Sequence, residues 1–226
     1  MNARCRYWLP GLLVLAALAP VAADESGDSA MERIGDERYR IGSIVVDRKA
    51  KTFTVPGKIL HLDEPLEYLA VSAAGMKAYE SLLELETSPR DFNLACILIG
   101  LDNKNVVRPE YQFDQTPVKG PAVDIAVIFE QDGKTVTIPA ANALANGDET
   151  FDDDRWAYTG SEMSHDGKQF MAEIGGTLIG FVHDPLSVIE HEHGAGIGAY
   201  GSITGNEALL PPEGSAVALR VTARGD

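Results

Sequence analysis

The densest pattern in the sequence is a short strand followed by an apolar helix, at residues 75–101. An apolar run within residues 77–84 predicts the strand. Ser88 has the residue type of a helix N-cap, and Pro89 suits the first helical position. Apolar residues then recur at helical spacing and also fill the other side of the cylinder, which predicts a helix covered on several sides. Gly100 suits a left-handed turn at its end.

Short β-branched runs on both sides of this helix predict strands. The Asp132-Gly133 pair predicts a tight hairpin between two of them, and VPGK at 55–58 predicts a turn. The predicted strands are 41–46, 52–55, 66–72, 123–129, 135–138, 156–159, 170–173, 177–182 and 216–222. We therefore expect an α+β fold, in which a mostly antiparallel β-sheet packs around one principal buried α-helix.

The N-terminal region predicts export. Residues 1–23 combine two arginines, an apolar run and small residues, with Val21 and Ala23 at the −3 and −1 positions of a cleavage site. The apolar run is shorter than the ~20 residues of a spanning helix, so we expect no membrane anchor after cleavage. Residues 24–37 are polar and predict a flexible leader, and 38–226 predict one α+β domain. The mature protein is expected to be soluble and periplasmic or extracellular.

Net charge narrows the choice of partners, and the cysteine content decides whether a disulfide can form. The formal net charge is −15, and removal of Arg4 and Arg6 with the signal peptide makes the mature chain more negative. Nucleic acid and anionic membrane surfaces would repel such a chain, so neither is expected as a partner. Cys96 is the one thiol left after cleavage, which excludes an internal disulfide.

Several sequence segments occur in a characteristic order: TVPGKI (54–59), LEYLAV (66–71), AYESLL (78–83), SPRDFNLACILIGL (88–101), WAYTGSEM (156–163) and DGKQFMAEIGGTLIGFVHDPLSVI (166–189), followed by a Gly-rich tail. This order resembles the YdjY domain family of bacterial exported proteins. The resemblance implies the fold and the exported location, and it implies no activity. Some members carry a ferredoxin-like label, but an iron–sulfur cluster needs about four thiolates and Cys96 alone remains here.

Metal-capable side chains concentrate at residues 183–193. His191 and His193 alternate on an extended segment and would point to the same side, and His183 lies shortly before them. Imidazole together with the carboxylates among these residues suits zinc or copper. The sequence therefore offers His183, His191 and His193 as candidate metal ligands, with a solvated loop as the alternative.

Other motifs have simpler interpretations. The acidic run at 148–154 lacks the spacing of a calcium loop and predicts a charged surface loop. The glycines at 196–201 have dinucleotide-loop spacing but no helix pattern after them. Ser81 and Ser161 lack the G-x-S-x-G elbow of an exposed nucleophile. Cys96 lies in the apolar helix and is expected to be an inert core residue.

The sequence thus favours a non-enzymatic exported module without a cofactor. We expect it to bind another envelope or secreted protein through a sheet edge or the Gly-rich region. The alternative is an envelope protein that binds zinc or copper through its histidines.

Overall fold

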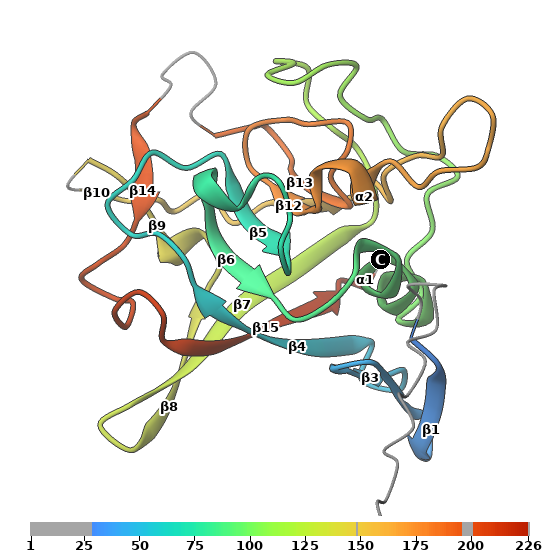
Figure 1. The fold of residues 1–226 in the computed structure, drawn as a ribbon, viewed down its shortest axis with the longest axis horizontal. Coiled ribbons are helices and arrows are strands. Elements are labelled where there is room, and N and C mark those ends of the chain that lie inside the picture. Colours follow the sequence, from blue (N-terminus) through green and yellow to red (C-terminus); the bar gives the residue numbers. More distant parts are fainter. Residues whose placement is uncertain (1–28, 148, 196–200, 226) are drawn as a thin grey trace, which may run out of the picture.

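The centre of the molecule is a closed barrel of eight strands (Figure 1). The structure is a computed structural model and describes residues 29–147, 149–195 and 201–225. Each barrel strand pairs with the next, and the last returns to pair with the first. In order around the barrel the strands are β4 (Thr52–Ile59), β15 (Ala216–Ala223), β7 (Ala122–Gln131), β11 (Trp156–Tyr158), β13 (Ile189–His191), β12 (Thr177–Gly180), β5 (Tyr68–Ser72) and β6 (Ser81–Leu85).

The two halves of the barrel differ in how they are buried. Most neighbouring strands are antiparallel, but β5–β6 and β12–β13 are parallel. Strands β4, β7 and β15 alternate between buried and more exposed residues, so one of their faces lines the core. Strands β5, β11, β12 and β13 are buried along their whole length, so other parts of the chain cover their outer face.

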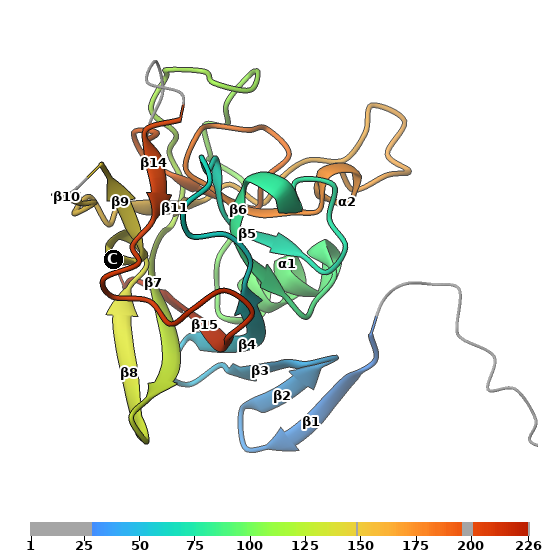
Figure 2. The same ribbon diagram turned by 60° about the vertical axis from the view of Figure 1, so that its left-hand side comes forward.

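Further strands extend the sheet beyond the barrel. Strands β1 (Met31–Gly35), β2 (Arg38–Ile41) and β3 (Ile44–Asp47) continue outward from β4, and Figure 2 shows β1 and β2 projecting from the body. Strand β8 (Lys134–Pro139) pairs with β7 beside the barrel. A separate small sheet contains β10 (Glu149–Thr150), β9 (Leu144–Asn146) and β14 (Ile203–Gly205). The short helical elements are η1 (Ala78–Glu80), η2 (Ala141–Ala143) and α2 (Ala172–Gly175).

The long helix α1 (Pro89–Leu98) lies at one side of the barrel, where it contacts β3, β12 and α2 (Figure 1). The predicted N-cap is confirmed, because the Ser88 Oγ accepts a hydrogen bond from the Asp91 N–H at 3.1 Å. The ring of Phe92 packs edge-on against Phe53 of β4, with 5.2 Å between centroids. On the opposite face, Ile97 is 51% exposed. The helix therefore buries one face, and the prediction that it is covered on several sides is wrong.

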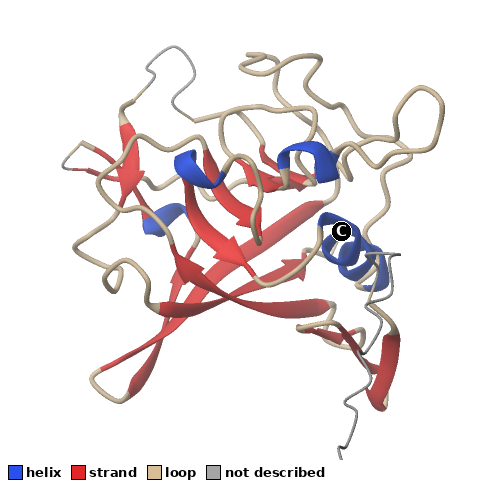
Figure 3. Cartoon of the chain, in the orientation of Figure 1, coloured by secondary structure: helices blue, strands red, loops and turns tan. Residues whose placement is uncertain are grey.

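The predicted fold class is also wrong. The structure is mostly β, with 40% strand and 10% helix, and a barrel rather than a principal helix organises the core (Figure 3). The physical reason is that pairing between β4 and β6, together with β15 between β4 and β7, closes the sheet on itself. The buried residues of these strands fill the interior, so α1 only covers part of the outside.

Local predictions fared unevenly. The hairpin at Asp132-Gly133 is confirmed, with both residues at positive φ (51° and 70°) between β7 and β8. The predicted turn at residues 55–58 lies inside strand β4, and the predicted strand at 170–173 is replaced by a bridge at Phe170 and the start of α2. The described part of the predicted leader contains strand β1, which pairs with β2.

Candidate functional site

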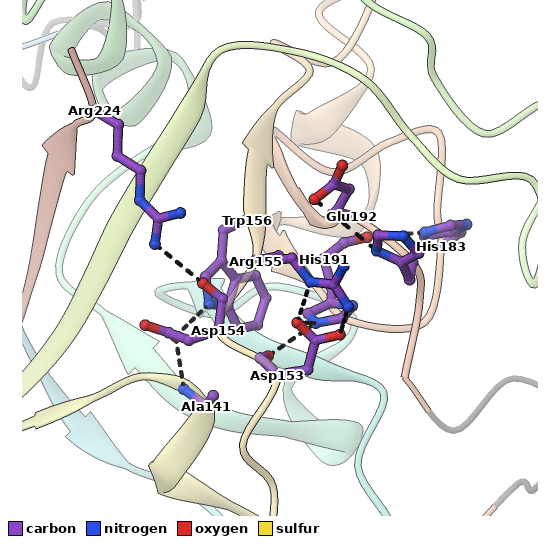
Figure 4. A network of polar contacts seen from close by, with 10 residues as sticks. Ala141, Asp153, Asp154, Arg155, Trp156, His183, His191, Glu192 and Arg224 are labelled. Atoms are coloured by element: carbon purple, nitrogen blue, oxygen red, sulfur yellow. Dashed lines mark hydrogen bonds and ion pairs between the residues drawn. The ribbon is translucent and has the colours of Figure 1, made fainter. Parts of the chain in front are cut away.

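His183 is buried, and its ring links its own loop to the loop at Asp114 and to strand β13. Its Nδ1 lies 2.6 Å from the Asp114 carbonyl oxygen. Its Nε2 lies 2.9 Å from the His191 carbonyl oxygen (Figure 4). The Phe113 N–H also donates to the His183 carbonyl oxygen at 2.8 Å. His183 thus fixes the long connection after α1 to the barrel, with both ring nitrogens facing backbone acceptors.

His191 and His193 point into different surroundings. The buried His191 ring has its Nε2 2.9 Å from the Asp153 carbonyl oxygen and packs edge-on against Trp156. Burial lowers the pKa of His191, which favours the neutral ring. His193 is partly exposed, and its Nδ1 lies 4.0 Å from a Glu192 carboxylate oxygen. Within the described ranges, no group of three or more His, Cys, Asp or Glu side chains converges in a way that could hold a metal. The rings of His183, His191 and His193 contact different groups, and the metal ligand set stays a prediction.

The acidic run has structural contacts in its described part. Asp153 pairs with Arg155, with 2.6 Å between the guanidinium Nε and Oδ1 (Figure 4). The Asp154 Oδ1 accepts hydrogen bonds from the Ala141 N–H and the Trp156 indole N–H. Position 148 lies outside the described residues, as do positions 196–200 of the Gly-rich segment.

The hydroxyl groups of the two candidate nucleophiles donate hydrogen bonds to the backbone. Ser81 Oγ donates to the Lys77 carbonyl oxygen at 2.6 Å, and Ser161 Oγ donates to the Leu186 carbonyl oxygen at 2.8 Å. Cys96 is fully buried, and burial raises the pKa of its thiol well above the usual range. The thiol therefore stays protonated in the core.

A buried polar cluster lies elsewhere, where β5 begins beside η1 and the connection after α1 passes over it. We call it the Tyr68 cluster, and its members are Glu67, Tyr68, Lys77, Glu80, Gln112 and Asp184. The Tyr68 hydroxyl donates to Asp184 Oδ2 at 2.7 Å. The Gln112 amide donates to Glu67 Oε2 at 2.9 Å, and the Lys77 ammonium donates to Glu80 Oε1 at 2.6 Å. The cluster thus contains three carboxyl groups and one cation, and Glu80 is the carboxyl group that accepts the hydrogen bond from this cation.

Burial raises the pKa values of two groups in the Tyr68 cluster. Burial, and then the nearby Glu80 carboxylate, raise the pKa of Glu67 to about 6. Burial, and then Asp184, raise the pKa of Tyr68, so its hydroxyl remains a hydrogen-bond donor. A buried carboxyl group that titrates near pH 6 is a common feature of functional sites, although structural networks produce it as well.

Glu190 of β13 extends this network into the barrel wall. Its Oε1 accepts a hydrogen bond from the Asp184 N–H at 3.0 Å, and its buried Oε2 has no hydrogen-bond partner among the described residues. The Oε2 lies beside Gly180, where an added Cβ would come within 2.9 Å of it. Burial raises the pKa of Glu190 well above its usual range, which favours the neutral acid.

The surface beside the Tyr68 cluster carries exposed apolar side chains. Met76 and Tyr79 are each 64% exposed, and Tyr111 is 61% exposed. Their two chain segments meet at Tyr68, because Lys77 lies over the Tyr68 ring and Gln112 contacts the Tyr68 hydroxyl. We call Met76, Tyr79 and Tyr111 the Tyr79–Tyr111 surface. Aromatic and methionine side chains of this kind are enriched at protein interfaces.

Sequence reasoning missed this site. Its members come from segments far apart in the chain, and only Glu67 gives a local signal, because it interrupts the apolar run LEYLAV. Glu67 is buried directly before β5, and a buried charged residue must have polar partners, of which Gln112 is one. The sequence contains no sign of where such partners would come from.

The fold and site define a mostly β protein, built on a closed barrel with a buried ionisable cluster near its surface. Residues 44–222 match the family model of the YdjY domain, and the chain belongs to that family. This confirms the resemblance seen in the sequence. No curated protein and no solved structure matches the chain. In the part of the chain described here, no helix is long and apolar enough to cross a membrane.

Proposed function

We propose that the protein is an exported, non-enzymatic binding module that holds a basic segment of another envelope or secreted protein on the Tyr79–Tyr111 surface. The observation that carries this proposal is the exposure of Met76, Tyr79 and Tyr111, which are 64%, 64% and 61% exposed beside one buried polar cluster. Exposed large apolar side chains that gather beside polar groups are typical of interaction sites. Tyrosine adds contact area at low conformational cost.

Charge favours a basic partner. The chain has a formal net charge of −15, so its field attracts cationic segments and repels anionic ones. The Tyr68 cluster adds three buried carboxyl groups beside the apolar side chains, against the single ammonium group of Lys77. A partner segment with lysine or arginine beside apolar residues complements both features.

Binding fits the cluster better than catalysis does. The polar atoms that could react are engaged with one another: the Tyr68 hydroxyl with Asp184, a Glu80 oxygen with Lys77, and a Glu67 oxygen with Gln112. A general base must reach a substrate proton within hydrogen-bond distance, and these groups face inward to their partners instead.

Site-specific photo-crosslinking in cells that export the protein tests the proposal. A crosslinking residue at Tyr79 and another at Tyr111 should capture the same partner. The control position is Thr135, which is exposed on β8, a strand that pairs with β7 alone among the described strands. A crosslink at Thr135 without one at Tyr79 or Tyr111 would assign binding to the β8 sheet edge and contradict the proposed surface.

Affinity measurements then quantify the contact. With the captured partner purified, Tyr79→Ala and Tyr111→Ala should each weaken binding about tenfold, as expected for aromatic side chains at an interface centre. Thr135→Ala should leave the dissociation constant unchanged. Raising the salt concentration should slow association if the partner is basic, because screening weakens long-range attraction.

A further inference from the structure

The ammonium group of Lys77 sits against two tyrosine rings and a carboxylate. Its Nζ lies 5.6 Å from the Tyr68 ring centroid, 5.9 Å from the Tyr79 ring centroid and 2.6 Å from Glu80 Oε1. Both ring distances are within the range of cation–π attraction. Glu67 adds a second carboxyl group whose charge acts on the same ammonium. These groups together form a cation-binding site, and Lys77 of the same chain occupies it.

The Lys77 side chain is more exposed than the carboxylate that it contacts. The Lys77 side chain is 24% exposed, whereas that of Glu80 is 8% exposed, so the cation lies at the mouth of the site and the carboxylate lies behind it. The backbone of this segment is held separately, since the Lys77 N–H donates to the Gly175 carbonyl oxygen at 3.3 Å. Rotation of the flexible side chain could therefore empty the site without moving the backbone.

We propose that Tyr68, Tyr79 and Glu80 form a cage for an alkylammonium or guanidinium group, which Lys77 fills in the free protein and a lysine or arginine side chain of the partner fills in the complex. The identity of the second occupant rests on the function proposed above. Replacement of one cation by another keeps the charge of the cage unchanged, so the exchange leaves no buried carboxylate unpaired. Tyr79 is exposed enough to contact both the incoming cation and the rest of the partner.

A small amine tests the cage without the partner. Lys77→Ala removes the internal occupant, and n-butylammonium reproduces the missing part of the side chain. Thermal shift and calorimetry should show saturable binding of butylammonium to Lys77→Ala, at least tenfold tighter than to the wild type. Neutral 1-butanol should not reproduce the effect. Equal responses of the wild type and Lys77→Ala, or equal effects of butanol and butylammonium, would overturn the proposal.

Two further variants identify the cage residues. In the Lys77→Ala background, Glu80→Gln removes the charge and Tyr79→Leu removes one ring, and each should weaken butylammonium binding at least tenfold. Tyr79 is exposed, so its replacement tests the cage without disturbing the core. Should Lys77→Ala fail to fold by itself, butylammonium should restore folding and butanol should not. Restoration by both compounds, or by neither, would refute the cage.

The cage and the binding surface can fail separately. A partner crosslinked at Tyr79 and Tyr111, combined with no butylammonium binding to Lys77→Ala, refutes the cage and leaves the surface in place. Butylammonium binding without any crosslinked partner supports the cage and refutes the proposed function.

Discussion

Replacement of Glu67 by glutamine should stabilise the protein above pH 6. Burial and the neighbouring Glu80 raise the pKa of Glu67 from an ordinary 4.5 to about 6 in the folded protein. This pKa difference of roughly 1.5 corresponds to about 2 kcal/mol in the free energy of unfolding, at 1.36 kcal/mol for each pKa unit. The folded state holds the Glu67 proton more tightly than the unfolded state, so the contribution of Glu67 to stability is complete below pH 4.5 and is lost as the pH rises through 6. Glutamine cannot ionise and avoids this loss.

Urea denaturation of the wild type and Glu67→Gln between pH 4 and pH 8 measures the effect. The two free energies of unfolding should be similar at pH 4 and should separate until the variant is more stable by up to about 2 kcal/mol at pH 8. The amide of glutamine keeps an oxygen that can accept the Gln112 hydrogen bond, so this contact is preserved. The difference between the two proteins therefore reports the ionisation of Glu67.

The matched control is Glu64→Gln. Glu64 is exposed three residues earlier, so this change removes the same charge without relieving burial, and it should alter stability by less than about 0.5 kcal/mol at any pH. The reasoning would be refuted by a Glu67→Gln variant that is less stable than the wild type at pH 8, or by a stability difference that does not depend on pH.

Three further experiments test the N-cap of α1, the buried face of α1 and the predicted metal site. Ser88→Ala should lower the free energy of unfolding by about 1 kcal/mol in urea, because it removes the N-cap acceptor of α1. Ala95→Asp should prevent folding because the position is fully buried, whereas Ile97→Asp should fold normally on the exposed face, and circular dichroism distinguishes the two outcomes. Zinc or copper should shift the melting temperature of the wild type and of His191→Ala/His193→Ala equally. A larger shift in the wild type would instead establish the predicted metal site.

Local signals predicted the elements that local chemistry determines. The start of α1 follows from Ser88 and Pro89, and the β7–β8 hairpin follows from Asp132 and Gly133, because caps and tight turns involve only a few neighbouring residues. The barrel could not be predicted in this way. Its closure depends on pairing between strands distant in sequence, and β11, β12 and β13 are short and buried on both faces, so they show no alternation.

The candidate site was hidden for a related reason. His183 and His191 are close in sequence and contact each other through a backbone oxygen, yet their rings make separate contacts. Glu67, Gln112 and Asp184 are far apart in sequence and belong to one buried network. Proximity along the chain therefore suggested a histidine cluster, while the polar network depended on how β5 and the long connection meet in three dimensions.

The position of β15 has a consequence for how the protein is made. This strand, Ala216–Ala223, is the last in chain order, and it pairs on one side with β4 and on the other with β7. When the chain is synthesised from its N-terminus, β4 and β7 lack their common neighbour until residues 216–223 have been made. Unpaired strand edges of this kind invite pairing with other chains. The barrel therefore cannot close before β15 has been made, and a chaperone that covers the open edges of β4 and β7 would act while residues 132–215 are synthesised.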